Sequence, residues 1–153
     1  MAFAGKQMMT YEYIRGLVEG EGCFSFCQGY KKYQGGKYKL PTFEIAMHER
    51  DQELLIKVKD RLGLRNKIYN YPPAKNALSK GRKAVLIVRE FDQLKDIIIP
   101  LFYKKLHGHK AKQFAEWLEK IGSDPDISNR FKSLYRLHKW GIYNKSPFSE
   151  KYL

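Results

Sequence analysis

The chain has 153 residues, and 29 Lys and Arg against 16 Asp and Glu give a formal net charge of +13. Hydrophobic residues make up 43% and aromatic residues 14%, which is enough apolar surface to exclude a disordered basic tail. Two cysteines exclude a disulfide-stapled scaffold, and no apolar run approaches the roughly 20 residues of a membrane span. We therefore expect one folded domain over residues 1–153 whose partner is a polyanion, either nucleic acid or a membrane surface.

The first predicted element is a helix from about residue 10 to residue 21. Thr10 is a suitable N-cap, and Glu12 places a negative charge in the first turn, where the helix dipole favours it. Apolar residues then recur at helical spacing as far as Gly20. These apolar residues are Tyr13, Ile14, Leu17 and Val18.

Two strand pairs and four more helices follow. The predicted strands cover residues 23–35, 38–47, 67–71 and 83–88, and the predicted helices cover 51–62, 91–101, 110–121 and 129–140. The order is therefore αββαββα, followed by C-terminal helices at about 110–140. This order predicts an α+β fold in which helices cover one face of an antiparallel sheet and leave the other face open.

The open face of this sheet is expected to carry Lys, Tyr and small polar side chains. Alternation along the strands turns Phe24, Phe43 and Ile68 toward the helices and their neighbours outward. Lys can contact phosphates, and Tyr and small polar groups can contact base edges. The alternative is that these residues are simply the solvent-exposed face of an antiparallel sheet, which is normally polar even without a ligand. The predicted nucleic-acid-binding residues are Ser25, Cys27, Lys31, Tyr33, Tyr38, Thr42, Glu44, Lys67, Tyr69, Tyr71 and Lys83.

The segment IRGLVEGEG, residues 14–22, carries the residues expected to perform chemistry. Gly16 and Gly20 lie on one helix face, where small residues let another backbone approach closely. Glu21 falls at the helix C-terminus, where the dipole disfavours an anion. A divalent cation held by this carboxylate and by backbone carbonyls would explain why an acidic residue lies there. Glu19 lies about 200° round the helix and is expected to be a hydrogen-bonding or capping partner.

This segment resembles the LAGLIDADG motif of the homing endonucleases. Gly16, Leu17 and Gly22 are identical to the motif consensus, and Ile14 and Val18 are conservative replacements. Glu19 and Glu21 take its two acidic positions. Gly20 stands in the place of a small alanine, and Arg15 in the second place is less usual. The family shares the αββαββα layout, so the resemblance extends over the whole chain at the level of element order.

The resemblance implies a site-specific DNA endonuclease. Members with one motif act as homodimers, so a homodimer is expected here. It would bind a long pseudo-palindromic duplex, hydrolyse one phosphodiester in each strand and leave short 3′ overhangs. Glu21 and the backbone carbonyl of Gly20 would hold Mg²⁺. Mn²⁺ is expected to substitute, whereas Ca²⁺ should support binding without cleavage. The expected dimer interface consists of Tyr13, Gly16, Leu17, Glu19 and Gly20.

The resemblance further implies two catalytic side chains besides Glu21. The family often places a polar residue, commonly Gln, near the end of the second strand to order water. Here that position is Met47, so either its neighbour His48 or ordered water alone takes the role. A basic residue near the start of the third helix usually approaches the cleavage centre, and Lys110 is the candidate. Its competitors are Lys105, His107 and His109.

Two other functions remain open for the same fold. One is an RNA-binding intron maturase, and the other is a non-catalytic basic DNA-binding protein. The retained Glu21 argues against both, because neither explains a carboxylate at that place. Neither a membrane nor a small-molecule substrate is expected. Members of the family are usually encoded in introns of organelles and microbes, which implies an intracellular protein of a mitochondrion, a chloroplast, or an archaeal or bacterial cytoplasm.

Overall fold

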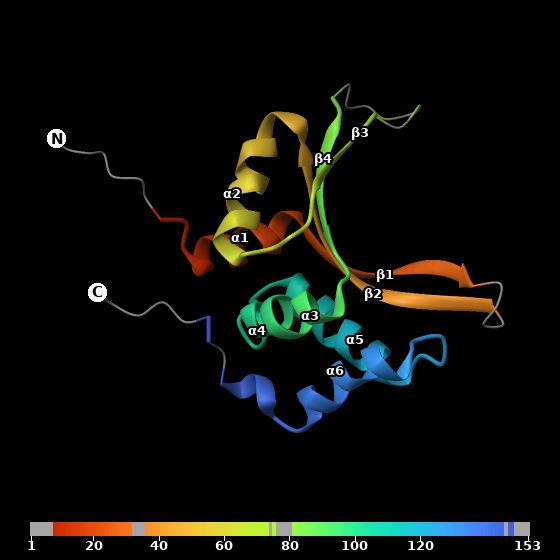
Figure 1. The fold of residues 1–153 in the computed structure, drawn as a ribbon. Coiled ribbons are helices and arrows are strands. Elements are labelled where there is room, and N and C mark those ends of the chain that lie inside the picture. The colour runs from red at the N-terminus through yellow and green to blue at the C-terminus, as the bar shows by residue number, and fades with distance from the viewer. Residues whose placement is uncertain (1–7, 32–35, 74, 76–80, 146, 149–153) are drawn as a thin grey trace.

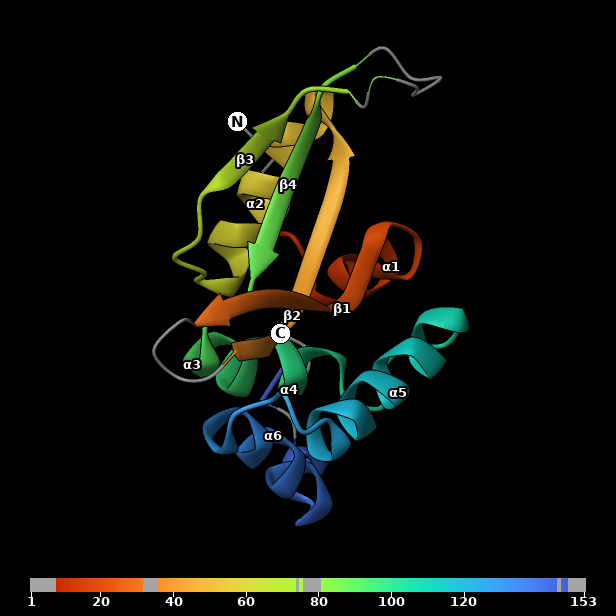
Figure 2. The same cartoon turned by 90° about the vertical axis from the view of Figure 1, so that its right-hand side faces the viewer.

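The computed structural model describes residues 8–31, 36–73, 75, 81–145 and 147–148. It confirms the predicted α+β fold, with one antiparallel sheet and helices packed on one of its faces (Figures 1 and 2). The helices and strands are α1 (Tyr11–Glu21), β1 (Gly22–Lys31), β2 (Gly36–His48), η2 (Glu49–Asp51), α2 (Gln52–Leu62), β3 (Ile68–Tyr71), β4 (Lys83–Val88), α3 (Phe91–Gln93), η3 (Leu94–Ile98), α4 (Ile99–Phe102), α5 (His109–Ser123), α6 (Asn129–Lys139) and η4 (Ile142–Asn144).

The four strands lie in the order β1-β2-β4-β3, and every neighbouring pair is antiparallel. β2 is the longest strand, and it pairs with both β1 and β4. Gly22, the first residue of β1, lies opposite Ile45, and Phe43 lies opposite Val88 at the end of β4. Figure 1 shows the β1–β2 arm and the β3–β4 arm running in different directions on either side of a bend in β2. The open face is therefore concave.

The strands alternate as the sequence predicts. Phe24, Phe43 and Leu86 are buried under the helices. Tyr69 and Tyr71, which point the opposite way from Ile68, are each 45% exposed. These buried strand residues pack with apolar residues of α1, α2, α4 and α5 in one hydrophobic core. Among the described residues, no helix is long and apolar enough to cross a membrane.

Helix α1 begins and ends at the residues that the sequence indicates. The Thr10 side chain accepts a hydrogen bond from the backbone N–H of Tyr13 at 3.0 Å, which satisfies one of the free donors of the first turn. At the other end, the N–H of Gly22 donates to the carbonyl of Val18, and β1 starts at Gly22 itself. The chain thus passes from helix to strand without a loop.

Arg15 is buried inside this helix, with 3% of its surface exposed. Its Nε donates to the carbonyl of Leu101 at 2.8 Å, and one Nη donates to the carbonyl of Phe148 at 2.6 Å. The other Nη forms an ion pair with Glu12 at 2.6 Å. The guanidinium therefore joins α1 to the end of α4 and to the C-terminal segment.

The helix predicted over residues 91–101 is present, but it is not regular. It consists of α3, a π-helical stretch η3 and α4, which together cover residues 91–102. Pro100 provides a physical reason, because it has no N–H and its ring crowds the carbonyl four residues earlier. A wider turn ahead of Pro100 relieves that crowding.

We expect Arg15→Ala to lower the free energy of unfolding by about 1–3 kcal/mol, because it leaves two carbonyls near the core without their donor. Chemical denaturation at one fixed protein concentration measures this loss. Glu12→Ala is the matched control: its side chain is 68% exposed, and an exposed ion pair contributes less than about 1 kcal/mol. Equal losses for the two variants would contradict the bridging role of Arg15.

Candidate active site and nucleic-acid interface

Glu21 is the last residue of α1, and it is exposed next to the first residue of the sheet. Within the part of the chain that the structure describes, its carboxylate has no hydrogen bond or ion pair. The carbonyl of Gly20 lies in the same last turn, where a helix leaves its carbonyls without partners from the helix itself. A free carboxylate and a free carbonyl thus lie side by side.

Gly22 is required by close packing at this junction. A Cβ at position 22 would lie 2.6 Å from Cγ1 of Val18 and 3.0 Å from the carbonyl oxygen of Val18. Val18 is fully buried, so neither atom can move away easily. Glycine is therefore the residue that lets α1 turn directly into β1 and holds Glu21 at the edge of the sheet.

The structure brings Lys110 to the same place. Lys110 lies in the first turn of α5, and its Nζ donates to the carbonyl of Gly22 at 2.5 Å. An ammonium group is thereby held one residue away from Glu21. Lys105, His107 and His109, the competing basic residues, are exposed.

Glu19 connects the same two helices from the other side. Its carboxylate accepts from the backbone N–H of His107 at 2.6 Å and from that of Gly108 at 3.2 Å. These donors precede the first turn of α5, where the helix dipole favours a negative charge. The predicted capping role of Glu19 is confirmed, and its partner is a different helix from its own.

Two further residues of α5 bind the backbone of β1, and sequence reasoning missed both of these contacts. Gln113 accepts from the N–H of Phe24 at 2.9 Å, and the indole N–H of Trp117 donates to the carbonyl of Ser25 at 2.8 Å. Together with Lys110 they follow a three- and four-residue spacing on one side of α5. The sequence signal for these contacts is Gln113, a polar residue that shares the spacing of the apolar residues of α5.

Within the described residues His48 makes no hydrogen bond or ion pair with Glu21 or Lys110, and its catalytic role stays a prediction. His48 lies at the end of β2, three residues beyond Ile45, the partner of Gly22. A strand rises about 3.4 Å per residue, so His48 is about 10 Å further along the sheet. Its Nδ1 accepts from the N–H of Arg50 at 3.1 Å. Met47 packs against the core, whereas Glu44, the register partner of Cys23, is a half-buried polar residue of β2 next to the junction.

None of the residues that the structure describes covers the outer face of α1. A Cβ added at Gly16 or at Gly20 would meet no atom of these residues within 4 Å. Tyr13, on the same side, is 51% exposed, whereas Leu17 is half-buried and packs against the core. Gly16 lies in the middle of α1, where a glycine destabilises a helix relative to alanine, and Gly20 lies in its last turn.

The donors at the junction fit a hard divalent cation, although one chain supplies few of them. Glu21 and the Gly20 carbonyl offer oxygen ligands, which Mg²⁺ prefers. The described residues contain no group of three or more His, Cys, Asp or Glu that could hold a metal ion.

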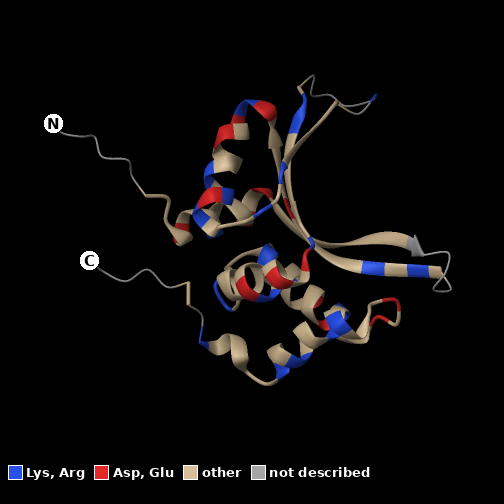
Figure 3. Cartoon of the chain, in the orientation of Figure 1, with Lys and Arg blue, Asp and Glu red and all other residues tan. Residues whose placement is uncertain are grey.

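The concave face carries most of the residues predicted to bind nucleic acid, with one correction. Thr42 is 4% exposed, and its hydroxyl donates to the carbonyl of Leu40 at 3.0 Å, so it is not available to a base edge. Tyr33 lies outside the described residues, and Lys31 ends β1. Figure 3 shows basic residues toward the far ends of the two sheet arms. The remaining predicted residues Ser25, Cys27, Tyr38, Glu44, Lys67, Tyr69, Tyr71 and Lys83 are exposed or half-buried.

A family model described as LAGLIDADG endonuclease matches residues 14–121, well over half of the chain. The chain belongs to the LAGLIDADG endonuclease family. The matched region runs from α1 to α5, so it contains both helices that meet at Glu21. The family inferred from the motif is thereby confirmed.

Solved structures of LAGLIDADG homing endonucleases share the fold. The I-LtrWI enzyme bound to target DNA has 29% identity and a TM-score of 0.59, over 71% of this chain and 35% of that one. The I-SmaMI enzyme bound to cleaved DNA has 21% identity and a TM-score of 0.61, over 92% and 47% of the two chains. The homing endonuclease I-TnaI has 18% identity and a TM-score of 0.54, over 86% and 97%. This LAGLIDADG chain thus spans less than half of the first two proteins.

We expect Glu19→Ala to lower the free energy of unfolding by about 1 kcal/mol, because two amide donors ahead of α5 lose their acceptor. Amide hydrogen exchange at His107 and Gly108 should accelerate in the same variant. Glu116→Ala is the control, since Glu116 is exposed on α5 and reaches only Lys112 at 4.0 Å. Unchanged exchange at the two amides would contradict the capping contact.

Proposed function

We propose that this protein is a site-specific DNA endonuclease that acts as a homodimer with a divalent metal, normally Mg²⁺. It binds a long pseudo-palindromic duplex in its concave sheets, hydrolyses one phosphodiester in each strand and leaves short 3′ overhangs. The observation that carries the proposal is the unpaired carboxylate of Glu21, held at the edge of that sheet beside the ammonium group of Lys110.

The metal chemistry is assigned to the free oxygen atoms of the junction. Glu21 and the carbonyl of Gly20 would hold the ion together with the same residues of a second copy. A bound divalent ion supplies charge stabilisation for the reacting phosphate and lowers the pKa of a water molecule. Two carboxylates brought close together repel each other, so they favour an arrangement in which a cation lies between them.

Lys110 supplies the positive charge next to this carboxylate. Its ammonium group has three donors, and one of them is occupied by the carbonyl of Gly22. The others are free to donate to a phosphate oxygen of DNA lying over the junction. The contact with Gly22 also keeps the long Lys side chain in one place, which lowers the entropy that binding must overcome.

The dimer is proposed because the site is incomplete in one chain. Crossing two α1 helices at Gly16 and Gly20 would cover the glycine face and bring both Glu21 residues together. The same crossing places two concave sheets side by side along one duplex. The charge of +13 per chain then becomes +26 per dimer. Such a surface predicts many phosphate contacts and affinity that falls steeply with salt.

Glu21→Gln should abolish cleavage and preserve DNA binding, because the amide keeps the shape of the side chain but loses the negative charge. We expect the cleavage rate to fall by a factor on the order of 10² or more with Mg²⁺ or Mn²⁺. The target duplex can be found by selecting sequences bound in Ca²⁺. Cleavage is measured on labelled duplex, and binding is measured by gel retardation in Ca²⁺.

Glu12→Gln is the matched control for that experiment. It also removes one carboxylate from α1, but from an exposed residue of the first turn, so cleavage should be unchanged. Full cleavage by Glu21→Gln would refute the catalytic assignment. A wild-type chain that binds duplex DNA and cuts none with any divalent ion would leave only a binding protein.

Gly16→Leu should prevent dimer formation without unfolding the chain. The described residues leave open space at this position, so the new side chain clashes with none of them and would clash with a second α1 packed there. Sedimentation equilibrium should give a mass near twice 18.0 kDa for the wild type and near 18.0 kDa for the variant. Glu116→Leu adds the same side chain at an exposed position of α5 and should leave the mass unchanged. A dimeric Gly16→Leu variant would rule out this interface.

A further inference from the structure

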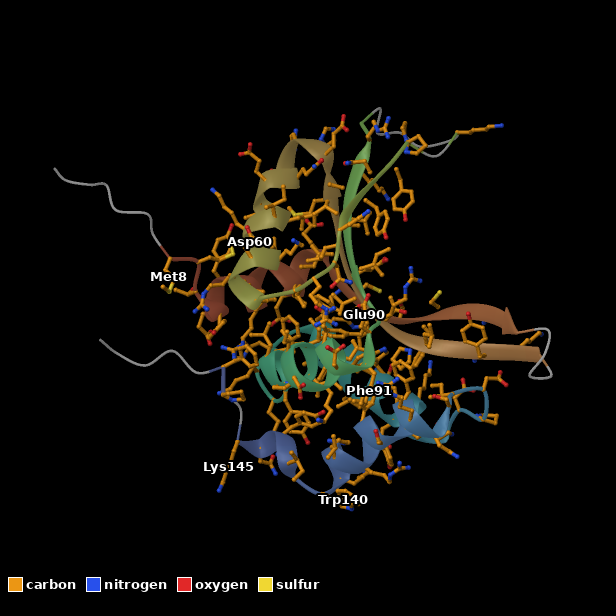
Figure 4. All side chains as sticks on the ribbon, in the orientation of Figure 1. Met8, Asp60, Glu90, Phe91, Trp140 and Lys145 are labelled. Carbon is orange, nitrogen blue, oxygen red and sulfur yellow. The ribbon has the colours of Figure 1, made fainter. Side chains whose placement is uncertain are left out.

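Arg89 lies on the concave face, although it is not among the residues that the sequence pattern selects. It follows the last residue of β4 and continues the alternation of Lys83, Val85 and Ile87, which points away from the helices. Its neighbour Glu90 is labelled in Figure 4 where the two arms of the sheet meet. Arg89 is therefore an exposed basic residue near the middle of the sheet, whereas Figure 3 shows most other basic residues of the sheet nearer the arm ends.

The side chain of Arg89 reaches across the sheet. One Nη donates to Sγ of Cys27 at 3.2 Å. Cys27 belongs to β1, and β2 lies between β1 and β4, so the side chain spans two strand spacings, about 10 Å. Continuing the register by one residue beyond Phe43↔Val88 places it beside Thr42 of β2. Thr42 directs its hydroxyl to Leu40, and the guanidinium crosses β2 without needing it as a partner.

The guanidinium remains available to a ligand. Within the described residues Arg89 forms no ion pair, and the Cys27 thiol is the acceptor of its side chain. A thiol is a weak acceptor, so a stronger one displaces it at little cost. Arg presents five donors in a planar fork that matches two acceptors at once. Arg89 therefore presents two oriented donors on the concave surface, and a ligand can accept from them in place of the thiol.

We propose that Arg89 reads a guanine in each half of the DNA target, donating to O6 and N7 in the major groove. The inference rests on the proposed function and adds a base-specific contact to it. A sheet ribbon fits the major groove, and Arg with guanine is the commonest specific pair there. Arg89 follows the last residue of β4 on the concave face, which is the surface that the proposed function places against the DNA. Cys27 then acts as a positioning residue, because its thiol holds the fork extended over β2.

The test compares three proteins by binding-site selection from randomised duplexes in Ca²⁺. Wild type should select one G·C pair at symmetric positions of the two half-sites. Arg89→Ala should lose that preference and bind the wild-type target about 5- to 150-fold more weakly. Arg89→Gln should prefer A·T at the same positions, because Gln pairs with adenine N6 and N7. A merely structural role of Arg89 would not exchange one base for another.

Arg136→Ala is the matched control, since Arg136 is an exposed arginine of α6 on the helical side. It should leave the selected sequence unchanged. In the wild type, replacing the selected G·C pair by A·T should weaken binding by the same factor as Arg89→Ala. In Arg89→Ala, the same base change should alter affinity less than about twofold, because the protein and base changes remove one shared contact.

Two results would overturn the inference while the proposed function stands. One is an unchanged selected sequence for both Arg89→Ala and Arg89→Gln. The other is a uniform loss of affinity over all sequences with a salt slope reduced by about one, which marks a phosphate contact. A wild-type protein that selects no sequence at all would instead remove the proposed function and this inference with it.

Discussion

The direct passage from α1 to β1 at Gly22 is the constraint on which the candidate site depends. No residue with a side chain fits there, because Val18 fills the space that a Cβ would need. Glu21 is consequently carried by the end of a helix and the start of a strand instead of by a loop. Helix α5 holds the same junction through Lys110, Gln113 and Trp117. A carboxylate supported by two rigid elements keeps one position, as catalysis on a phosphodiester requires.

Local patterns predicted the parts of the fold that local physics decides. The cap at Thr10 and the end of the helix predicted over 51–62, which the structure closes with Gly63 at a left-handed φ of +71°, each depend on neighbours a few residues away. Strand alternation found the core face for the same reason, since the side-chain period of a strand is independent of its partners. Glu21 was identified because a carboxylate at a helix C-terminus conflicts with the dipole.

The features that were missed depend on contacts between distant parts of the chain. Arg15 is held by carbonyls 86 and 133 residues away, and nothing near it in the sequence shows that it is buried. Thr42 has the alternation of an open-face residue, but it is buried, and its hydroxyl donates to a carbonyl of its own strand.

The contact between Tyr11 and Phe148 has a consequence for how longer chains of this fold can arise. The two rings lie 5.1 Å apart, so the two ends of the described chain meet beside α1. In the proposed dimer, α1 lies at the two-fold axis, and both pairs of ends lie near that axis as well. Gene duplication with a short linker could thus convert a pair of such chains into one continuous protein of about twice the length.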